Sequence, residues 1–180
     1  MIINIVTPCS RPQNLEEISE SINIPLGRYR WIVVIDSSDT PSFRLPKNAE
    51  AYSAKVDGSV SGNGQRNKAL DMIDGGYVLF LDDDTILHKD LWDAVRYANE
   101  DIVCWKQSWK DGGHRLDAGN FSVGNVDSGS FMVKRSVIGD IRWDLGRYDA
   151  DGYFAQEVFS RKKTMRKIDE YLSYYNFLKL

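Results

Sequence analysis

Three consecutive aspartates, Asp82, Asp83 and Asp84, close an apolar run that begins at Tyr77. The apolar run predicts a buried strand, so three adjacent carboxylates stand at its end. Like charges about 4 Å apart repel by about 1 kcal/mol in water and by several-fold more near protein. A divalent cation such as Mg²⁺ or Mn²⁺ would offset this repulsion, because it prefers carboxylate and phosphate oxygens. The simpler alternative is an acidic turn that caps the next helix.

Two familiar acidic motifs fit this stretch poorly. A phosphatase-type Asp-x-Asp-x-Thr motif requires Thr at the position of Ile86. A calcium-binding EF-hand requires spaced acids and a central Gly, whereas Thr-Ile-Leu-His follows Asp84. Neither motif therefore accounts for the triplet.

Further polar residues follow the other predicted strands. Thr7, Pro8 and Arg11 come after the first strand, and Asp36 comes directly after the second. In an open α/β sheet, ligands bind beyond the carboxyl ends of the strands, so these groups and the triplet should converge. An acid at a strand end can accept hydrogen bonds from a ribose or a base, and adjacent acids can hold a metal against a diphosphate. Together they predict a nucleotide-diphosphate site.

A Gly-rich stretch at residues 58–64 leads into a predicted helix that carries Arg66 and Lys68. A helix N-terminus after flexible glycines favours anions, and Arg66 is placed to approach a phosphate. The alternative is an ordinary solvated first helical turn. The stretch is not a Walker loop, because Gly-Lys-Ser/Thr is missing.

Alternating strands and helices predict an α/β fold with a mixed, mostly parallel sheet flanked by helices. Asn14 and Glu17 form a pair typical of a capping box at the first helix. No repeat or linker is visible, so residues 1–180 are expected to form one domain. The expected strands are 2–6, 31–35, 51–56, 77–81, 101–109 and 125–133; the expected helices start at Pro12 and cover 65–73, 87–98 and 151–161; the expected loops are 37–47 and 110–119.

Composition narrows the classes of partner. The net charge of −3 gives no general attraction to nucleic acid or to anionic membranes. Cys9 and Cys104 do not resemble a disulfide framework or a zinc cluster, and they fit a reducing cytoplasm. The sequence shows neither a signal peptide nor an apolar run of about 18 residues, so we expect a cytoplasmic protein without a transmembrane segment. Peripheral membrane contact stays open.

The ordered set of these motifs resembles the inverting family 2 glycosyltransferases, which have the GT-A fold. The residues that carry the resemblance extend along nearly the whole chain. They are Thr7-Pro8 with Arg11, Asp36, Gln65 to Leu70, Phe80 to Asp84 with its Asp-x-Asp pattern, Ser128 to Arg135, Tyr148 to Phe154 and Tyr171 to Asn176. The resemblance implies a nucleotide-sugar-binding half at residues 1–100 and an acceptor-side half at residues 101–180.

The resemblance also implies roles on the nucleotide side. Thr7, Pro8 and Asp36 would hold the base and ribose of the donor, with Arg11 at the same site. Arg66 and Asn67 would lie under the nucleotide or its phosphates.

On the reaction side, the resemblance implies a metal and a general base. Asp82 and Asp83 would contact ribose, donor sugar or metal-bound water, and Asp84 would ligate the metal directly, with Asp82 as a further candidate ligand. Asp151 would be the general base. Asp149 is the alternative base, because Asp149-Ala150-Asp151 replaces the family's usual Glu-Asp pair. The simpler role for Asp151 is a helix N-cap.

The expected activity is therefore metal-dependent, inverting transfer of one sugar from a UDP- or GDP-linked donor, with Mn²⁺ or Mg²⁺. The acceptor would be a saccharide, a lipid-linked group or a protein. A Gln-x-x-Arg-Trp motif of processive synthases is absent, so a non-processive enzyme is expected. Two alternatives remain: an inactive nucleotide-sugar or carbohydrate-binding module, and a sugar nucleotidyltransferase. The latter would need a Gly-rich loop after the first strand, where Thr7 to Pro12 stand instead.

Overall fold

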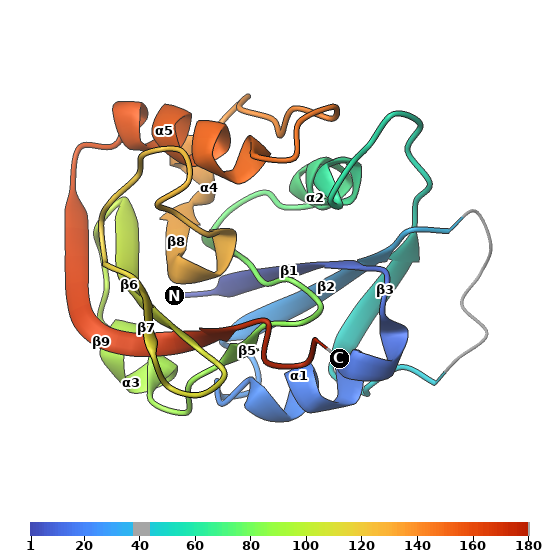
Figure 1. Cartoon of the computed structure of the whole chain (residues 1–180), viewed down its shortest axis with the longest axis horizontal. Coiled ribbons are helices and arrows are strands. Elements are labelled where there is room, and N and C mark those ends of the chain that lie inside the picture. The colour runs from blue at the N-terminus through green and yellow to red at the C-terminus, as the bar shows by residue number, and fades with distance from the viewer. Residues whose placement is uncertain (38–43, 180) are drawn as a thin grey trace.

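The computed structural model describes residues 1–37 and 44–179 (Figure 1). Its strands form a single mixed sheet in the order β3-β2-β1-β4-β8-β6-β9-β5, with β7 paired to β6. The strands are β1 (Ile3–Cys9), β2 (Tyr29–Ile35), β3 (Ala49–Ser53), β4 (Tyr77–Phe80), β5 (Ile86–Leu87), β6 (Ile102–Trp109), β7 (His114–Leu116), β8 (Phe131–Lys134) and β9 (Met165–Tyr175). The helices are α1 (Leu15–Ser21), α2 (Asn63–Leu70), α3 (Leu91–Val95), α4 (Arg135–Ile138) and α5 (Ala150–Arg161), with 3₁₀ turns η1 (Pro12–Asn14) and η2 (Ser128–Ser130).

The first half of the chain builds a parallel block. β1 lies between β2 and β4 and runs parallel to both, so the chain leaves β1 toward one side and later returns on the other. The carboxyl ends of the neighbouring strands β1 and β4 are therefore the topological switch point, where ligands bind in sheets of this type. The Asp82–Asp84 triplet directly follows β4 at this point.

Helices cover both faces of the sheet (Figure 1). Residues of β1, β2 and β4 alternate between two apolar clusters, as expected for strands buried on both sides. One cluster packs with α1 and α3, and the other packs with α2 and α5. This three-layer arrangement fixes the strand ends from which the polar loops extend.

The second half of the chain adds antiparallel strands and one long closing strand. β8 is antiparallel to both β4 and β6, whereas β9 runs parallel to β6 with register shifts around Lys106. β9 also pairs with the short β5, so the end of the chain returns to the region of the triplet. The tail from Tyr171 to Lys179 therefore packs back on the domain.

Several local expectations differ from the structure. Asn14 donates its side-chain amide to the Asp83 carbonyl at 2.8 Å and makes no capping hydrogen bond, so the capping box is wrong. Leu87 lies in β5 instead of a helix, because β9 supplies a strand partner for it. The expected loop at 110–119 contains β7, and the expected strand at 125–133 begins only at β8, after η2. The loop expected at 37–47 lies partly outside the described residues.

In the described ranges, no helix combines the length and apolar character needed to cross a membrane.

Candidate active site

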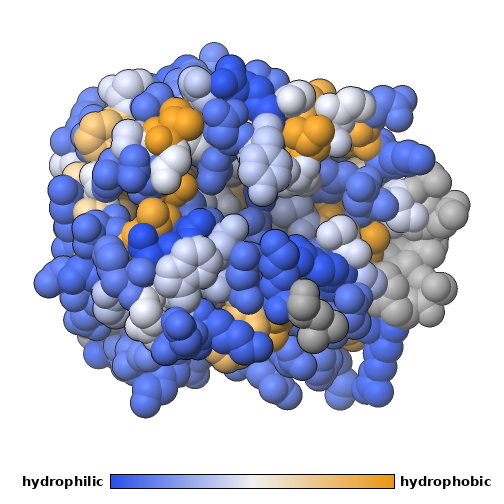
Figure 2. Space-filling model, viewed as in Figure 1, coloured by the Kyte–Doolittle hydropathy of each residue, from blue (hydrophilic) through white to orange (hydrophobic). Residues whose placement is uncertain are grey.

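A cavity of about 570 Å³ lies at the carboxyl ends of β1, β2 and β4. Its walls come from the loops after these strands, the start of α2, the segment before α5, the loop before η2 and the turn after β9. In Figure 2 the face shown is hollowed near its centre, and hydrophobic residues form only small, scattered patches around it. The cavity is therefore polar and open at the position that the sheet topology favours.

Asp83, the middle residue of the triplet, connects the loop after β4 to the loop after β1. Its Oδ2 accepts hydrogen bonds from the backbone amides of Ser10 and Arg11 at 2.6 and 2.7 Å, and its Oδ1 accepts one from Arg11 Nε at 2.8 Å. Asp83 is only 3% exposed. Since both oxygens are engaged within the protein, Asp83 ties β1 to β4 across the switch point.

Asp84 shares the same arginine. Arg11 Nη2 lies 2.9 Å from Asp84 Oδ2, and burial raises the pKa of the Asp84 carboxyl despite this ion pair. Among the described residues, the other oxygen, Oδ1, accepts a single long hydrogen bond, at 3.5 Å, from Thr85 Oγ1. Arg11 thus supplies part of the positive charge that the triplet needs.

Asp82 forms an ion pair with Arg66 through one carboxylate oxygen. Arg66 also donates to the Ser61 carbonyl at 2.6 Å and lies over the ring of Trp143, 4.5 Å from its centroid. Trp143 in turn stacks on Phe154 of α5, with ring centroids 4.6 Å apart. The Arg66 side chain is only 5% exposed, so it anchors the cavity wall.

Asp36 and Pro8 line one end of the cavity. Gln65 of α2 donates a 3.0 Å hydrogen bond to Asp36 Oδ1, which orients this otherwise exposed carboxylate. Gly62 has a positive φ of 76°, and a Cβ there would lie 2.6 Å from Pro8 Cβ. Only glycine allows this close approach of the Gly-rich loop to the first strand.

Two of the predicted site residues do not line the cavity. The Thr7 hydroxyl accepts a 3.0 Å hydrogen bond from Trp31 Nε1 inside the core, and Thr7 is fully buried. Asn67 bonds both the backbone N–H and the carbonyl of Trp143, so it holds the loop that carries Trp143. The other predicted residues, Pro8, Arg11, Asp36, Arg66, Asp82, Asp83, Asp84, Asp149 and Asp151, all line the cavity.

Asp151 begins the last helix on the far side of the cavity. Its Oδ1 accepts a 2.8 Å hydrogen bond from the Gly152 amide, while burial raises the pKa of its carboxyl to about 6. Asp149 forms an ion pair with Arg147 at 3.3 Å, and its side chain is 48% exposed. A pKa of about 6 suits Asp151 to act as a general base near neutral pH.

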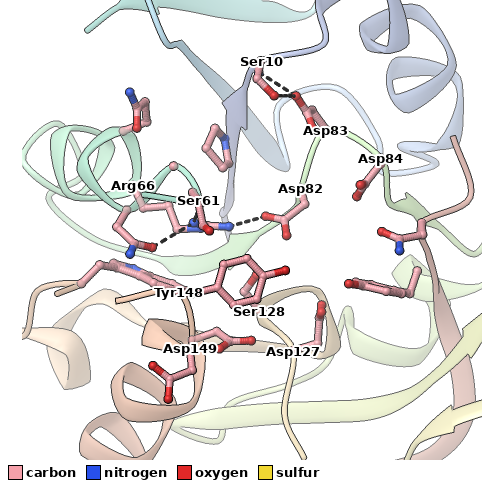
Figure 3. Close-up of a pocket in the computed structure, with 18 of the residues that line it drawn as sticks. Ser10, Ser61, Arg66, Asp82, Asp83, Asp84, Asp127, Ser128, Tyr148 and Asp149 are labelled. Carbon is pink, nitrogen blue, oxygen red and sulfur yellow. Dashed lines mark hydrogen bonds and ion pairs between the residues drawn. The ribbon is translucent and has the colours of Figure 1, made fainter. Parts of the chain in front are cut away.

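The structure also brings to the cavity residues that sequence reasoning did not assign to the site, among them Asp127, Arg115, Tyr148 and Lys179. Asp127 and Arg115 come from the loop before η2 and from β7. Tyr148, 87% exposed, projects over the cavity from the segment before α5 (Figure 3), and Lys179 lies in the turn after β9. Tyr148 begins the motif Tyr148 to Phe154 but was given no role, and the other three residues belong to no motif. The available signal was the position of Asp127, an acid next to the predicted acceptor-side strand.

Among the described residues lining the cavity, seven aspartates face three arginines and one lysine. In Figure 3, Asp82 and Asp84 face the same open space, and each keeps one carboxylate oxygen outside its arginine ion pair. Mg²⁺ and Mn²⁺ are commonly bound by one or two carboxylates together with substrate phosphates. This donor set therefore fits a divalent cation, although no group of three or more His, Cys, Asp or Glu in residues 1–37 and 44–179 is arranged as a metal site by itself.

Comparison with known proteins identifies the fold. No protein-family model matches the chain, and no curated protein matches it in sequence. The structure of S. aureus TarS 1–349 matches 97% of this chain with a TM-score of 0.76 at 16% identity, and the same protein in complex with UDP-GlcNAc matches 96% with a TM-score of 0.74 at 18% identity. The mannosyltransferase PcManGT from Pyrobaculum calidifontis, in complex with GDP-Man and Mn²⁺, matches 94% with a TM-score of 0.64 at 12% identity.

These likenesses show that the chain has the GT-A glycosyltransferase fold, a single mixed α/β sheet flanked by helices, and the expected fold class is confirmed. The chain spans 60% of the TarS 1–349 chain and 55% of the mannosyltransferase chain.

Proposed function

We propose that this protein is a glycosyltransferase that moves one sugar from a nucleotide-diphosphate donor to an acceptor hydroxyl. The observation that carries the proposal is the placement of Asp151: a carboxyl with a pKa of about 6 lines the same cavity as Asp82 and Asp84. A base and a cation-binding pair on one cavity are the chemical groups that metal-assisted, inverting glycosyl transfer uses. The GT-A fold and the structural neighbours that bind UDP-GlcNAc and GDP-Man support the same function.

In the proposed complex, the nucleoside lies at the end of the cavity formed by Pro8 and Asp36. The Asp36 carboxylate, oriented by Gln65, accepts hydrogen bonds from the base or the ribose. Asp82 faces the ribose or the donor sugar. Residues 1–100 would thus bind the nucleotide sugar, and residues 101–180 would contribute the acceptor side.

Asp84 and Asp82 would hold Mn²⁺ or Mg²⁺ through the oxygens that their arginine partners leave free. The bound cation would neutralise charge on the leaving diphosphate. This assignment follows from the excess of carboxylates, because the donor itself adds further negative charge to a cavity whose four cationic side chains face seven aspartates.

The reaction would be a single displacement with inversion. The Asp151 carboxylate removes the proton of the acceptor hydroxyl as its oxygen attacks the anomeric carbon, and general base catalysis of this kind contributes about 10²–10⁴-fold. The bond from the anomeric carbon to the phosphate oxygen breaks, and the nucleoside diphosphate leaves with the electron pair. Because a Gln-x-x-Arg-Trp motif is absent, one sugar would be transferred per binding event.

The test is a panel of UDP- and GDP-linked sugars, incubated with saccharide, lipid-linked and peptide acceptors in Mn²⁺, in Mg²⁺ and in EDTA. We expect release of nucleoside diphosphate and a product of inverted anomeric configuration. The Asp151→Asn variant should lose turnover by at least about 10²-fold while donor affinity stays within about two-fold. Asp140→Asn, a surface change outside the cavity, is the matched control and should behave as wild type.

The same panel separates the alternative functions. A binding module would bind a donor without turnover under any metal condition. A nucleotidyltransferase would release pyrophosphate from a nucleoside triphosphate and a sugar phosphate. Normal turnover by Asp151→Asn, with loss in Asp149→Asn, would transfer the base role to Asp149.

A further inference from the structure

Asp127 is a buried carboxylate on the cavity wall opposite the acidic triplet. Its side chain is 9% exposed. Oδ1 accepts hydrogen bonds from Gln107 Nε2 at 3.0 Å and from the Gly129 amide at 2.9 Å. Among the described residues, Oδ2 has one ion-pair partner, Arg115 Nη1 at 3.4 Å. One oxygen is therefore fixed by the protein, while the other keeps hydrogen-bonding capacity for a ligand.

The residues around Asp127 are themselves held in place. Gln107 of β6 is fully buried, and its Oε1 accepts a hydrogen bond from Arg115. The Arg115 guanidinium lies 3.5 Å from the ring centroid of Tyr175 on β9, which is a cation–π stack. Three strands thus fix the orientation of one carboxylate, an arrangement typical of a preorganised binding group.

The displacement reaction proposed above would place the transferred sugar near Asp127. The leaving diphosphate would lie at Asp82 and Asp84, and the attacking hydroxyl would lie at Asp151, so the transferred sugar must lie between these two walls. Figure 3 shows the Asp127 carboxylate directed into the open space below Asp82 and Asp84. Both Asp82 and Asp151 are close enough to interact electrostatically with Asp127.

We propose that Asp127 binds hydroxyl groups of the transferred sugar and selects neutral donors over sugars that carry a carboxylate. The proposal rests on the proposed glycosyltransferase function. A carboxylate accepts hydrogen bonds from sugar hydroxyls, and such charge-assisted bonds are among the stronger ones in proteins. A uronate carboxylate at the same place would be repelled by Asp127 and its acidic neighbours.

The experiment measures affinity as a function of the sugar part of the ligand. Titration calorimetry compares UDP with UDP-glucose and UDP-glucuronate, and GDP with GDP-mannose and GDP-mannuronate, for wild type, Asp127→Asn and the surface control Asp140→Asn. Asn keeps an oxygen for Gln107 and Gly129, so the fold should be preserved. We expect Asp127→Asn to bind the nucleoside diphosphate as wild type does and the neutral nucleotide sugar about 10-fold to 100-fold more weakly.

A second measurement changes the donor sugar and compares wild type with Asp127→Asn. Donors that lack one ring hydroxyl at a time should show one position whose removal weakens binding to wild type by about 10-fold or more and has little effect in Asp127→Asn. The preference of wild type for the neutral donor over the uronate should narrow in the variant.

The outcomes are separable. Equal weakening of nucleoside diphosphate and nucleotide sugar in Asp127→Asn, or unchanged binding of both, overturns the role of Asp127 and leaves the glycosyltransferase proposal standing. Failure of wild type to bind any of these nucleotides overturns the proposed function and this inference with it.

Discussion

Replacing Asp151 by Asn should stabilise the fold while it abolishes transfer. The Asp151 carboxyl has a pKa of about 6 in the folded protein, against 3.8 for the ordinary carboxyl, because burial disfavours its charged form. Between these two pH values the unfolded chain has released its proton while the folded protein still holds it. Stability therefore falls as pH rises through this window, and above about pH 7 ionised Asp151 costs the fold about 3 kcal/mol.

Asn avoids this cost, because it stays neutral and can still accept the hydrogen bond from the Gly152 amide. Urea unfolding at pH 4 and pH 8 measures the effect. Near pH 4 the variant and wild type should have similar free energies of unfolding, and at pH 8 the variant should be more stable by up to about 3 kcal/mol.

Asp140→Asn is the control, and its change in the free energy of unfolding should have the opposite sign. Arg161 holds the pKa of Asp140 below its usual value, so the ionised carboxylate favours the folded state and its replacement should lower stability at pH 8. The reasoning would be refuted if the free energies of unfolding of Asp151→Asn and wild type differed by the same amount at both pH values. It would also be refuted if Asp151→Asn were less stable than wild type at pH 8.

Two further changes test how the cavity walls are held. Arg11→Ala should lower the free energy of unfolding at pH 7 by about 3 kcal/mol, because it leaves the buried carboxylates of Asp83 and Asp84 without their partner. Urea titration measures this loss, which should shrink as the pH is lowered and the carboxylates take up protons. Gly152→Ala should cost about 1–3 kcal/mol and weaken donor binding, because its Cβ would lie 2.7 Å from the backbone of Val123. Gly75→Ala, whose Cβ meets nothing within 4 Å, is the control for the glycine change, and equal losses in both variants would contradict the steric argument.

The sequence predicted the fold class because its signals are local. Apolar runs marked the parallel strands, and acids at their ends marked the edge where the cavity lies. The alternation of side chains along the first strand could also have predicted that Thr7 is buried in the core. Ile3 and Ile5 face the apolar cluster that packs with α1, and Thr7 continues the same alternation, so its hydroxyl lies in the core beside Trp31.

Other features depend on contacts between distant residues. Nothing local separates Asp83 from Asp84, and only the loop after β1, more than 70 residues earlier, makes Asp83 a structural bridge. Asp127 stands outside any motif, and its place at the cavity depends on the pairing of β6, β7 and β9. Leu87 has helical spacing but becomes a strand residue because β9 returns beside it.

The stacking of Trp143 between Arg66 and Phe154 gives the cavity an intrinsic fluorophore. Of the five tryptophans in the chain, Trp143 is the one among the described cavity-lining residues. Its indole lies under a guanidinium that is ion-paired to Asp82, so a ligand that rearranges this pair alters the charge next to the ring. Emission from Trp143 can therefore report nucleotide binding directly, without labels, and Trp143→Phe would identify its share of the signal.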